Sequence, residues 1–226
     1  FESGLFSLVD DYNKDRAYRY LNNVQVMFSI GAVMFPLLVD HIDFNIFYIC
    51  LFVFMICNGI LFSVGKSIDS FAGKPAGEKD GISFLKLLKN PYLVSYMLIM
   101  FLYIGAEGGL LYWLVQYFED IGAKDLGAKG VSAFWLLSIL GRLIGGRVRN
   151  AKKFLPFCFV LGALGMTSVL IFPNPNLKLM GVGLLGLGLA PMYPGLLAFG
   201  GSLSEEYKTT AYSLMVFSAG LGGTSM

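Results

Sequence analysis

The sequence has few charged residues, one histidine and three cysteines. Only 14% of its 226 residues are charged, whereas 56% are hydrophobic, which leaves too little polar surface to cover a soluble domain of this size. We therefore expect an integral membrane protein. A net charge of +2, without a patch that interleaves basic and aromatic residues, argues against nucleic acid as a partner.

The sequence also lacks the motifs of most enzyme classes. Cys50, Cys57 and Cys158 each lie in an apolar run without CxxC spacing, so we interpret them as small packing residues rather than metal ligands or a disulfide. His41 is predicted in a short turn between two apolar runs. No HExxH pattern and no nucleophile elbow are present. We expect no enzymatic activity, no metal and no cofactor.

Long apolar runs separated by short polar segments dominate the sequence. A helix needs about 20 apolar residues to cross the hydrocarbon core of a bilayer. The partial runs FESGLFSLV and SLMVFSAGLGGTSM at the two ends indicate a fragment of a longer protein. The predicted fold is an all-α, polytopic transmembrane bundle. Its six complete helices are expected at about residues 20–39, 44–64, 91–118, 131–146, 154–172 and 179–199.

Basic residues fall almost entirely on one side of these predicted helices. Cytoplasmic loops of membrane proteins carry such an excess, so the pattern assigns a direction to every helix. Only Lys124, Lys129 and Lys178 fall on the outer side. The inner side carries Lys14, Arg16, Arg19, Lys66, Lys74, Lys79, Lys86, Lys89, Arg142, Arg147, Arg149, Lys152, Lys153 and Lys208.

The longest polar stretch divides the chain into two predicted halves. Residues 65–90 carry five lysines and end in the amphipathic segment ISFLKLL, which we expect on the membrane surface. This stretch is the predicted cytoplasmic linker between residues 1–64 and residues 91–226. FSIG at 28–31 and FSAG at 217–220 each open an outward-going helix, which suggests parallel repeated halves. Such halves are typical of transporters, which bind the solute between them.

Several helices resemble those of a known transporter family. The segments are FESGLFSLV, YLNNVQVMFSIGAVMFPLL, LYIGAEGGLLYWLVQYF, GRLIGGRVRNAKKF and LAPMYPGLLAFG. They are similar to the end of helix four, helices five and seven, helix eight with its loop, and helix ten of the major facilitator superfamily, in particular its fucose-permease-type sugar symporters. The resemblance implies a twelve-helix fold with two pseudo-symmetric six-helix halves, a cell-membrane location and proton-coupled alternating access.

The resemblance also implies a gating segment at the end of the helix predicted at 131–146 and in the loop that follows it. Gly141, Arg142, Gly145 and Arg147 fit the family's pattern there. The Asp of that pattern is absent, and Asn150 stands in the comparable place. The alternative is that the basic loop serves only to orient the helices.

Two acidic residues are predicted at membrane depth, where an unpaired charge costs on the order of a few kcal/mol. Glu107 lies halfway along the 91–118 helix, and Glu2 lies roughly 10 Å from the inner boundary of the first partial helix. A carboxylate there can accept hydrogen bonds from solute hydroxyls or exchange a proton. The resemblance assigns proton coupling to Glu2 and substrate binding to Glu107. Alternatively, Glu107 forms a structural pair with a basic or amide group.

Further polar and aromatic residues are candidates for the wall of the site. Tyr112 and Gln116 follow Glu107 on one helix, and an aromatic ring beside an amide can stack on a sugar and bind its hydroxyls. Tyr112 could instead anchor the helix at the membrane interface. Asn22 and Gln25, one turn apart, either face the pathway or bond a neighbouring helix.

Two prolines lie in the run at 179–199. Pro191 and Pro194 free backbone carbonyls and permit bending, which suggests a gating helix with Tyr193 toward the cavity. Ordinary tight packing through its many glycines is the alternative.

Together these features predict a secondary transporter for a small polar solute, most simply a sugar, coupled to protons across the lipid bilayer. A carrier for a non-sugar solute, a channel and a structural helix bundle are the alternatives. The repeat and the basic linker favour a transporter over the last two.

Overall fold

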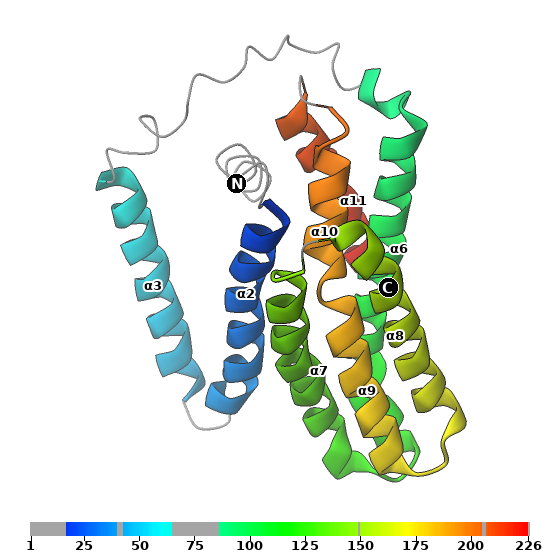
Figure 1. The fold of residues 1–226 in the computed structure, drawn as a ribbon. Coiled ribbons are helices and arrows are strands. Elements are labelled where there is room, and N and C mark those ends of the chain that lie inside the picture. Colours follow the sequence, from blue (N-terminus) through cyan, green and yellow to red (C-terminus); the bar gives the residue numbers. More distant parts are fainter. Residues whose placement is uncertain (1–16, 40–42, 65–85, 149, 205–206, 226) are drawn as a thin grey trace.

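The computed structural model describes residues 17–39, 43–64, 86–148, 150–204 and 207–225. All regular elements in these residues are helices, so the predicted all-α class is confirmed (Figure 1). Glu2 and residues 65–85 of the predicted linker lie outside the described residues. In chain order the helices are α2 (Ala17–Val39), α3 (Phe44–Val64), α6 (Pro91–Asp120), α7 (Lys124–Gly145), α8 (Ala151–Ile171), α9 (Pro175–Leu189), α10 (Met192–Gly201) and α11 (Lys208–Thr224).

Asparagine and proline residues fix the starts of three helices. The Asn90 side chain accepts hydrogen bonds from two backbone amides in the first turn of α6, at 3.0 and 3.4 Å. Pro91 occupies the first helical position, as the sequence predicts, because its missing N–H would be unpaired there anyway. Asn174 and Pro175 play the same two parts for α9, and Asn150 caps α8.

α7 begins at Lys124, so the prediction of a loop up to residue 130 was wrong. Gly122, with φ of 75°, reverses the chain directly after α6 in a conformation that favours glycine. The first turns of α7 then pack on α6, because a Cβ at Gly127 would lie 3.1 Å from the Cα of Val115. Close packing against α6 therefore extends the helix through a segment that is polar in sequence.

The helix predicted at 179–199 is interrupted. Neither Pro191 nor Pro194 has a backbone N–H to donate. α9 ends at Leu189 and α10 starts at Met192, with Ala190 and Pro191 between them. The bend expected from the prolines is present, and the carbonyls of Leu189 and Ala190 accept hydrogen bonds from α6 and α7.

Four helical stretches in the described residues are long and apolar enough to cross a membrane: α6, α7, α8 and the α9–α10 stretch Pro175–Gly201. α2 and α3 add 23 and 21 helical residues over the ranges predicted for two further spans. The described chain therefore supports a polytopic helical fold.

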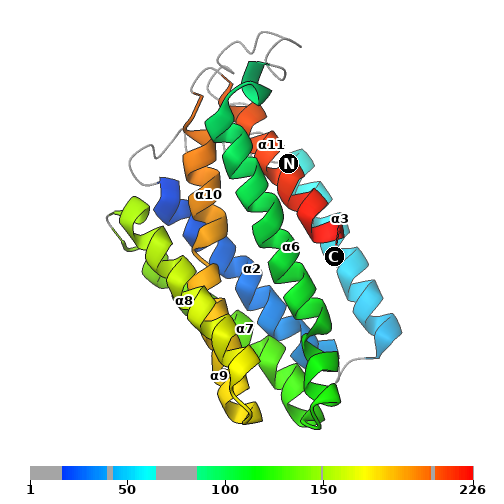
Figure 2. The same ribbon diagram turned by 90° about the vertical axis from the view of Figure 1, so that its right-hand side faces the viewer.

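The C-terminal helices form a packed bundle (Figures 1 and 2). α9 packs against both α7 and α8, α11 packs along α6, and α2 lies on α7. Buried side chains gather in two clusters, one with Leu93 near the start of α6 and one with Phe118 near its end. α6 is thus anchored at both ends, and its middle is left to border a cavity.

α3 lies at the edge of the described chain in Figure 1. Its apolar side chains, among them Ile49, Phe52 and Met55, are exposed, and it makes few contacts with the other described helices. Such a surface suits contact with lipid or with further protein.

Lys178 was predicted in an outer loop, but it is a buried residue of α9. Its Nζ donates to the Tyr117 hydroxyl and to the Val169 carbonyl, both at 2.6 Å. Val169 lies in the last turn of α8, where carbonyls without helical partners carry partial negative charge. The lysine joins α6, α8 and α9.

Candidate solute-binding site

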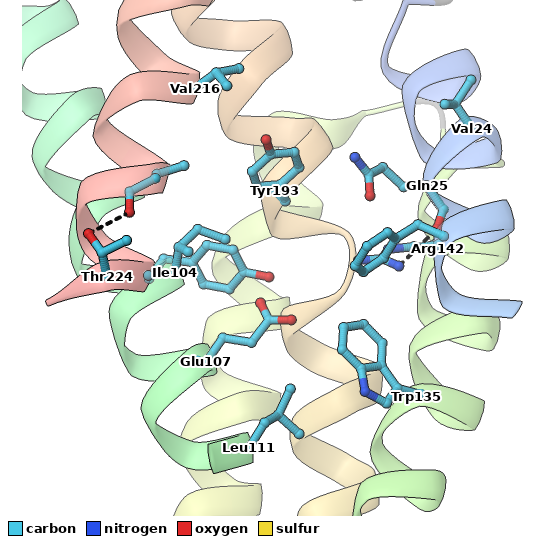
Figure 3. Close-up of a pocket in the computed structure, with 16 residues that line it drawn as sticks. Val24, Gln25, Ile104, Glu107, Leu111, Trp135, Arg142, Tyr193, Val216 and Thr224 are labelled. Carbon is cyan, nitrogen blue, oxygen red and sulfur yellow. Dashed lines mark hydrogen bonds between the residues drawn. The ribbon is translucent and has the colours of Figure 1, made fainter. Parts of the chain in front are cut away.

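A cavity of about 710 Å³ lies between α2 and the C-terminal helices (Figure 3). Its wall comes from α2, α6, α7, α10 and α11. Because α2 precedes the predicted linker and the other helices follow it, both sides of the linker contribute. The polar side chains in the wall include Gln25, Tyr103, Glu107, Arg142 and Tyr193.

Glu107 lies in the middle of α6 and is 9% exposed. Its carboxylate interacts with the Tyr103 hydroxyl, one turn earlier on α6, and no basic group of a described residue lies within 4.0 Å of it. Its neighbour Gly108 also lines the cavity, and a Cβ built there would meet no atom within 4 Å. The carboxylate therefore has acceptor capacity and open space beside it.

Two tyrosines lie near Glu107. Tyr103, one turn earlier on α6, donates its hydroxyl hydrogen bond to the Leu189 carbonyl at 3.1 Å. Tyr193 of α10 is buried and borders the cavity, as the sequence predicts, and Figure 3 shows its ring above Glu107. The interruption between α9 and α10 is what brings Tyr193 to the wall.

Arg142 was predicted near the inner end of the 131–146 helix, among the basic residues of the inner side; it lies in α7, is 3% exposed and lines the cavity. Its Nε donates to the Ala190 carbonyl at 3.4 Å. Its Nη1 donates to the Gln25 carbonyl at 2.9 Å and also to the Ser29 hydroxyl. Arg142 is therefore an interior residue that contacts α2 and the α9–α10 interruption.

The predicted gating glycines explain how α7 comes so close to its neighbours. A Cβ at Gly141 would overlap the Leu187 carbonyl of α9. A Cβ at Gly145 would lie 2.9 Å from the Pro191 side chain and 3.1 Å from the Tyr18 hydroxyl. Residues without a side chain permit this approach. Arg147, in contrast, is exposed and donates to the Leu143 carbonyl of its own helix.

An aromatic wall closes another side of the cavity. The Phe28 and Trp135 rings meet edge to face, with centroids 5.5 Å apart. Trp135 also meets the buried ring of Phe134 at 5.3 Å, which fixes the indole from behind. An indole held in this way offers a flat apolar surface to a ligand.

Tyr112 and Gln116 do not line the cavity, although the sequence nominates both. Tyr112 is 74% exposed and stacks edge to face on Trp113. Gln116 is exposed and donates to Asp120 at 2.8 Å. The face of α6 that borders the cavity runs through residues 103, 104, 107, 108 and 111, and the helical turn carries later residues away from it.

Asn22 and Gln25 separate on α2. Gln25 borders the cavity. Asn22 is fully buried, donates to the Tyr18 carbonyl at 2.8 Å and packs against Gly145 of α7. Gln25 therefore borders the cavity, whereas Asn22 packs against the neighbouring helix α7 and donates its hydrogen bond within α2.

Trp135 and Tyr103 are wall residues that the sequence analysis did not nominate. Trp135 precedes Arg142 by two helical turns and Tyr103 precedes Glu107 by one, so each shares a helix face with a charged residue at membrane depth. That spacing was the available signal. In the described part of the chain, no group of three His, Cys, Asp or Glu side chains could hold a metal.

A set of membrane-length helices around a cavity that contains both a carboxylate and a guanidinium defines a polytopic membrane protein with an interior polar site. The family model of the Major Facilitator Superfamily matches residues 7–225, and the chain belongs to that family. It is accordingly a multi-pass protein of the cell membrane and a member of a transporter family rather than an enzyme.

Two curated relatives are similar to the chain. The glucose/mannose transporter GlcP of Bacillus subtilis (strain 168) is 27% identical over 221 residues, which cover 90% of this chain and 54% of the relative. The membrane protein MosC of Rhizobium meliloti is 30% identical over 133 residues, which cover 57% of this chain and 33% of the relative. The matched region thus spans about half the length of GlcP and about a third of the length of MosC. No solved structure matches it.

Proposed function

We propose that this chain forms part of a secondary transporter that carries a neutral sugar through the cavity by alternating access. The complete protein would have the twelve-helix fold of two six-helix halves that the sequence resemblance implies, close to the fucose-permease-type symporters. Residues 1–64 would end the first half, residues 65–90 would link the halves, and residues 91–226 would form most of the second.

The observation that carries this proposal is the carboxylate of Glu107, which has no basic partner within 4.0 Å and keeps acceptor sites for a ligand, inside a cavity with an indole in its wall. Hydroxyl groups of a sugar donate hydrogen bonds to a carboxylate, and the apolar face of a sugar ring packs on an aromatic surface. Trp135 and Glu107 both line the cavity. A small polyhydroxylated ring would meet both needs at once.

The similarity to a glucose/mannose transporter over 90% of the chain supports the same solute class.

Proton coupling is the second part of the proposal, and we assign it to Glu2. This assignment rests on the resemblance, which places an acidic residue on helix four of such symporters. Glu2 lies outside the described residues.

The test is uptake by the full-length protein in proteoliposomes, with labelled D-glucose or D-mannose and an imposed pH gradient. We expect saturable uptake that excess unlabelled hexose abolishes and that an acidic outer medium drives above equilibrium. Uptake that rises linearly with concentration would indicate a channel and contradict the proposal.

A carrier for a carboxylated solute is the second candidate, and Arg142 favours it. No hydrogen bond from its Nη2 to another described residue is present, and the guanidinium borders the cavity. Guanidinium groups bind carboxylates through paired hydrogen bonds. Saturable uptake of a sugar acid such as gluconate, without uptake of hexoses, would favour this candidate.

A further inference from the structure

Glu107 is a buried carboxylate whose charge no described basic group balances at short range. It is 9% exposed, it lies in the middle of α6, and no nitrogen of a described Lys or Arg side chain lies within 4.0 Å of it. Its neighbour is the Tyr103 hydroxyl, which also donates to the Leu189 carbonyl. A carboxylate at membrane depth is costly unless a partner offsets its charge, and a neutral hydroxyl offsets it only in part.

Arg142 is the other charged residue among the described residues that line the cavity, and its own contacts hold it apart from Glu107. Its Nε donates to the Ala190 carbonyl at 3.4 Å, and its Nη1 donates to the Gln25 carbonyl at 2.9 Å. The guanidinium also lies 6.0 Å from the centroid of the Phe28 ring. These contacts keep the positive charge beside α2, so the carboxylate on α6 stays available to a cation that enters the cavity.

The surroundings of Glu107 suit an ammonium group. Gly108 beside it lines the cavity, and a Cβ built there would meet no atom within 4 Å, so there is room next to the carboxylate. The rings of Tyr193 and Trp135 line the same cavity (Figure 3). Aromatic faces attract cations, and the attraction is stronger where water is excluded. A carboxylate, open space and aromatic rings are together the features that bind an organic cation.

An amino sugar brings such a cation on a polyhydroxylated ring. Its ammonium replaces one hydroxyl and leaves the shape of the ring unchanged. A hydrogen bond from an ammonium to Glu107 joins two opposite charges, and hydrogen bonds between charged groups are stronger than those between neutral groups. Because Coulomb energy falls with distance, contact with Glu107 outweighs repulsion by the more distant Arg142. The remaining hydroxyls and the ring keep the partners proposed for a neutral hexose.

We propose that the site also takes an amino sugar in its cationic form, with the ammonium on Glu107 and the ring against Trp135. It binds this solute more tightly than the neutral hexose of the same shape. The proposal rests on the sugar-carrier function proposed above and adds the charge of the preferred solute.

D-Glucosamine and D-glucose are the matched probes, because they differ by an ammonium in place of one hydroxyl. Equilibrium binding of each labelled sugar to the purified full-length protein is measured at about pH 6, where an amine that titrates like an α-amino group, at about 7.7–8.0, is protonated. The readout is the ratio of the two dissociation constants within each variant, since a loss of folded protein affects both sugars alike.

We expect D-glucosamine to bind about tenfold more tightly than D-glucose to the unaltered protein. Glu107→Gln keeps the size of the side chain but removes its charge, so the ratio should fall to about one. Glu119→Gln removes a carboxylate from the exposed end of the same helix, outside the cavity wall, and should keep the ratio of the unaltered protein.

Equal or weaker binding of D-glucosamine by the unaltered protein would overturn the inference, and so would a preference for it that survives in Glu107→Gln. Either result leaves saturable hexose binding, and with it the proposed sugar carrier, in place. Absence of binding by both sugars would instead refute the sugar carrier itself. The two failures are therefore distinguishable.

Discussion

Glu107 and Arg142 are buried charges in one cavity, yet they form no ion pair with each other or with another described residue. A charge at membrane depth is costly, and it is kept where it contacts a solute, a partner or a water-filled space. We interpret the two residues as having different roles. Glu107 borders open volume and can accept further hydrogen bonds beside that of Tyr103, whereas Arg142 donates to α2 and to the α9–α10 interruption.

Replacing Glu107 should weaken sugar binding. Glu107→Gln keeps the size of the side chain but replaces a charged acceptor by a neutral one, and we expect about tenfold weaker binding. Glu107→Ala should abolish it. Thermal stabilisation of the full-length protein by added hexose is the measurement. Glu119→Gln, at the exposed end of the same helix, is the matched control. Equal stabilisation in all variants would remove Glu107 from the site.

Trp135 should contribute through its flat surface. Aromatic contacts add about 0.5–1.5 kcal/mol beyond area burial, so we expect Trp135→Ala to raise the sugar dissociation constant about threefold to tenfold. Trp135→Phe should lie between that variant and the unaltered protein. Trp113→Ala removes the other tryptophan, which is 59% exposed and outside the cavity wall, and should bind normally. Equal affinities for Trp135→Ala and Trp113→Ala would contradict the stacking role.

At the scale of elements, glycines determine how α7 and α9 meet. A Cβ at Gly141 would overlap the Leu187 carbonyl, and a Cβ at Gly186 would overlap the Phe134 carbonyl. Each helix thus presents a glycine to a backbone carbonyl of the other. This contact places Arg142 within reach of the α9–α10 interruption.

Gly186→Ala should destabilise the bundle. The added methyl group meets backbone rather than a flexible side chain, and such overpacking costs about 1–3 kcal/mol. The thermal unfolding midpoint of the full-length protein in detergent should fall. Gly31→Ala is the control, because a Cβ at Gly31 of α2 meets no atom within 4 Å. Similar midpoints for the two variants would show that α7 and α9 can separate at little cost.

At the scale of the molecule, the cavity has walls from helices on both sides of the predicted linker, and the chain spans about half of GlcP. Exposed apolar side chains on α3 offer a surface for contact with lipid or with further protein. The proton-coupling role proposed for Glu2 belongs to this scale, because it requires both halves.

Neutralising Glu2 should separate coupling from exchange. In the full-length protein we expect Glu2→Gln to lose sugar accumulation driven by a pH gradient, because a neutral amide cannot carry the proton, while exchange of labelled for unlabelled sugar continues. Transport assays in vesicles at several outer pH values measure both. Asp125→Asn, on the exposed first turn of α7, serves as control. Normal pH-dependent accumulation by Glu2→Gln would refute the symport proposal.

Helix positions were largely predictable because they depend on runs of apolar residues, which sequence displays directly. α3 matches its predicted range, and α6 starts at the predicted Pro91. The start of α7 was missed because its first turns are polar in sequence and are held by contacts with α6. The composition of a segment does not show which distant helix it will contact.

The site was predictable only in part. Glu107 was predicted as a site residue from its position halfway along a helix, and Tyr193 from its position between two prolines. Both residues line the cavity. Tyr112 and Gln116 were nominated by proximity in sequence, but the helical turn carries them to the outside.

The sequence by itself determined the membrane class, the helical fold and the resemblance to the family, because these follow from apolar runs and from local patterns of residues. Only the tertiary structure decided that Arg142 and Lys178 are interior groups and that Trp135 faces Glu107 across one cavity. The sequence alone does not distinguish a charged residue in a loop from one in a helix interior. Helix packing is what brings partners that are distant in sequence within hydrogen-bonding reach.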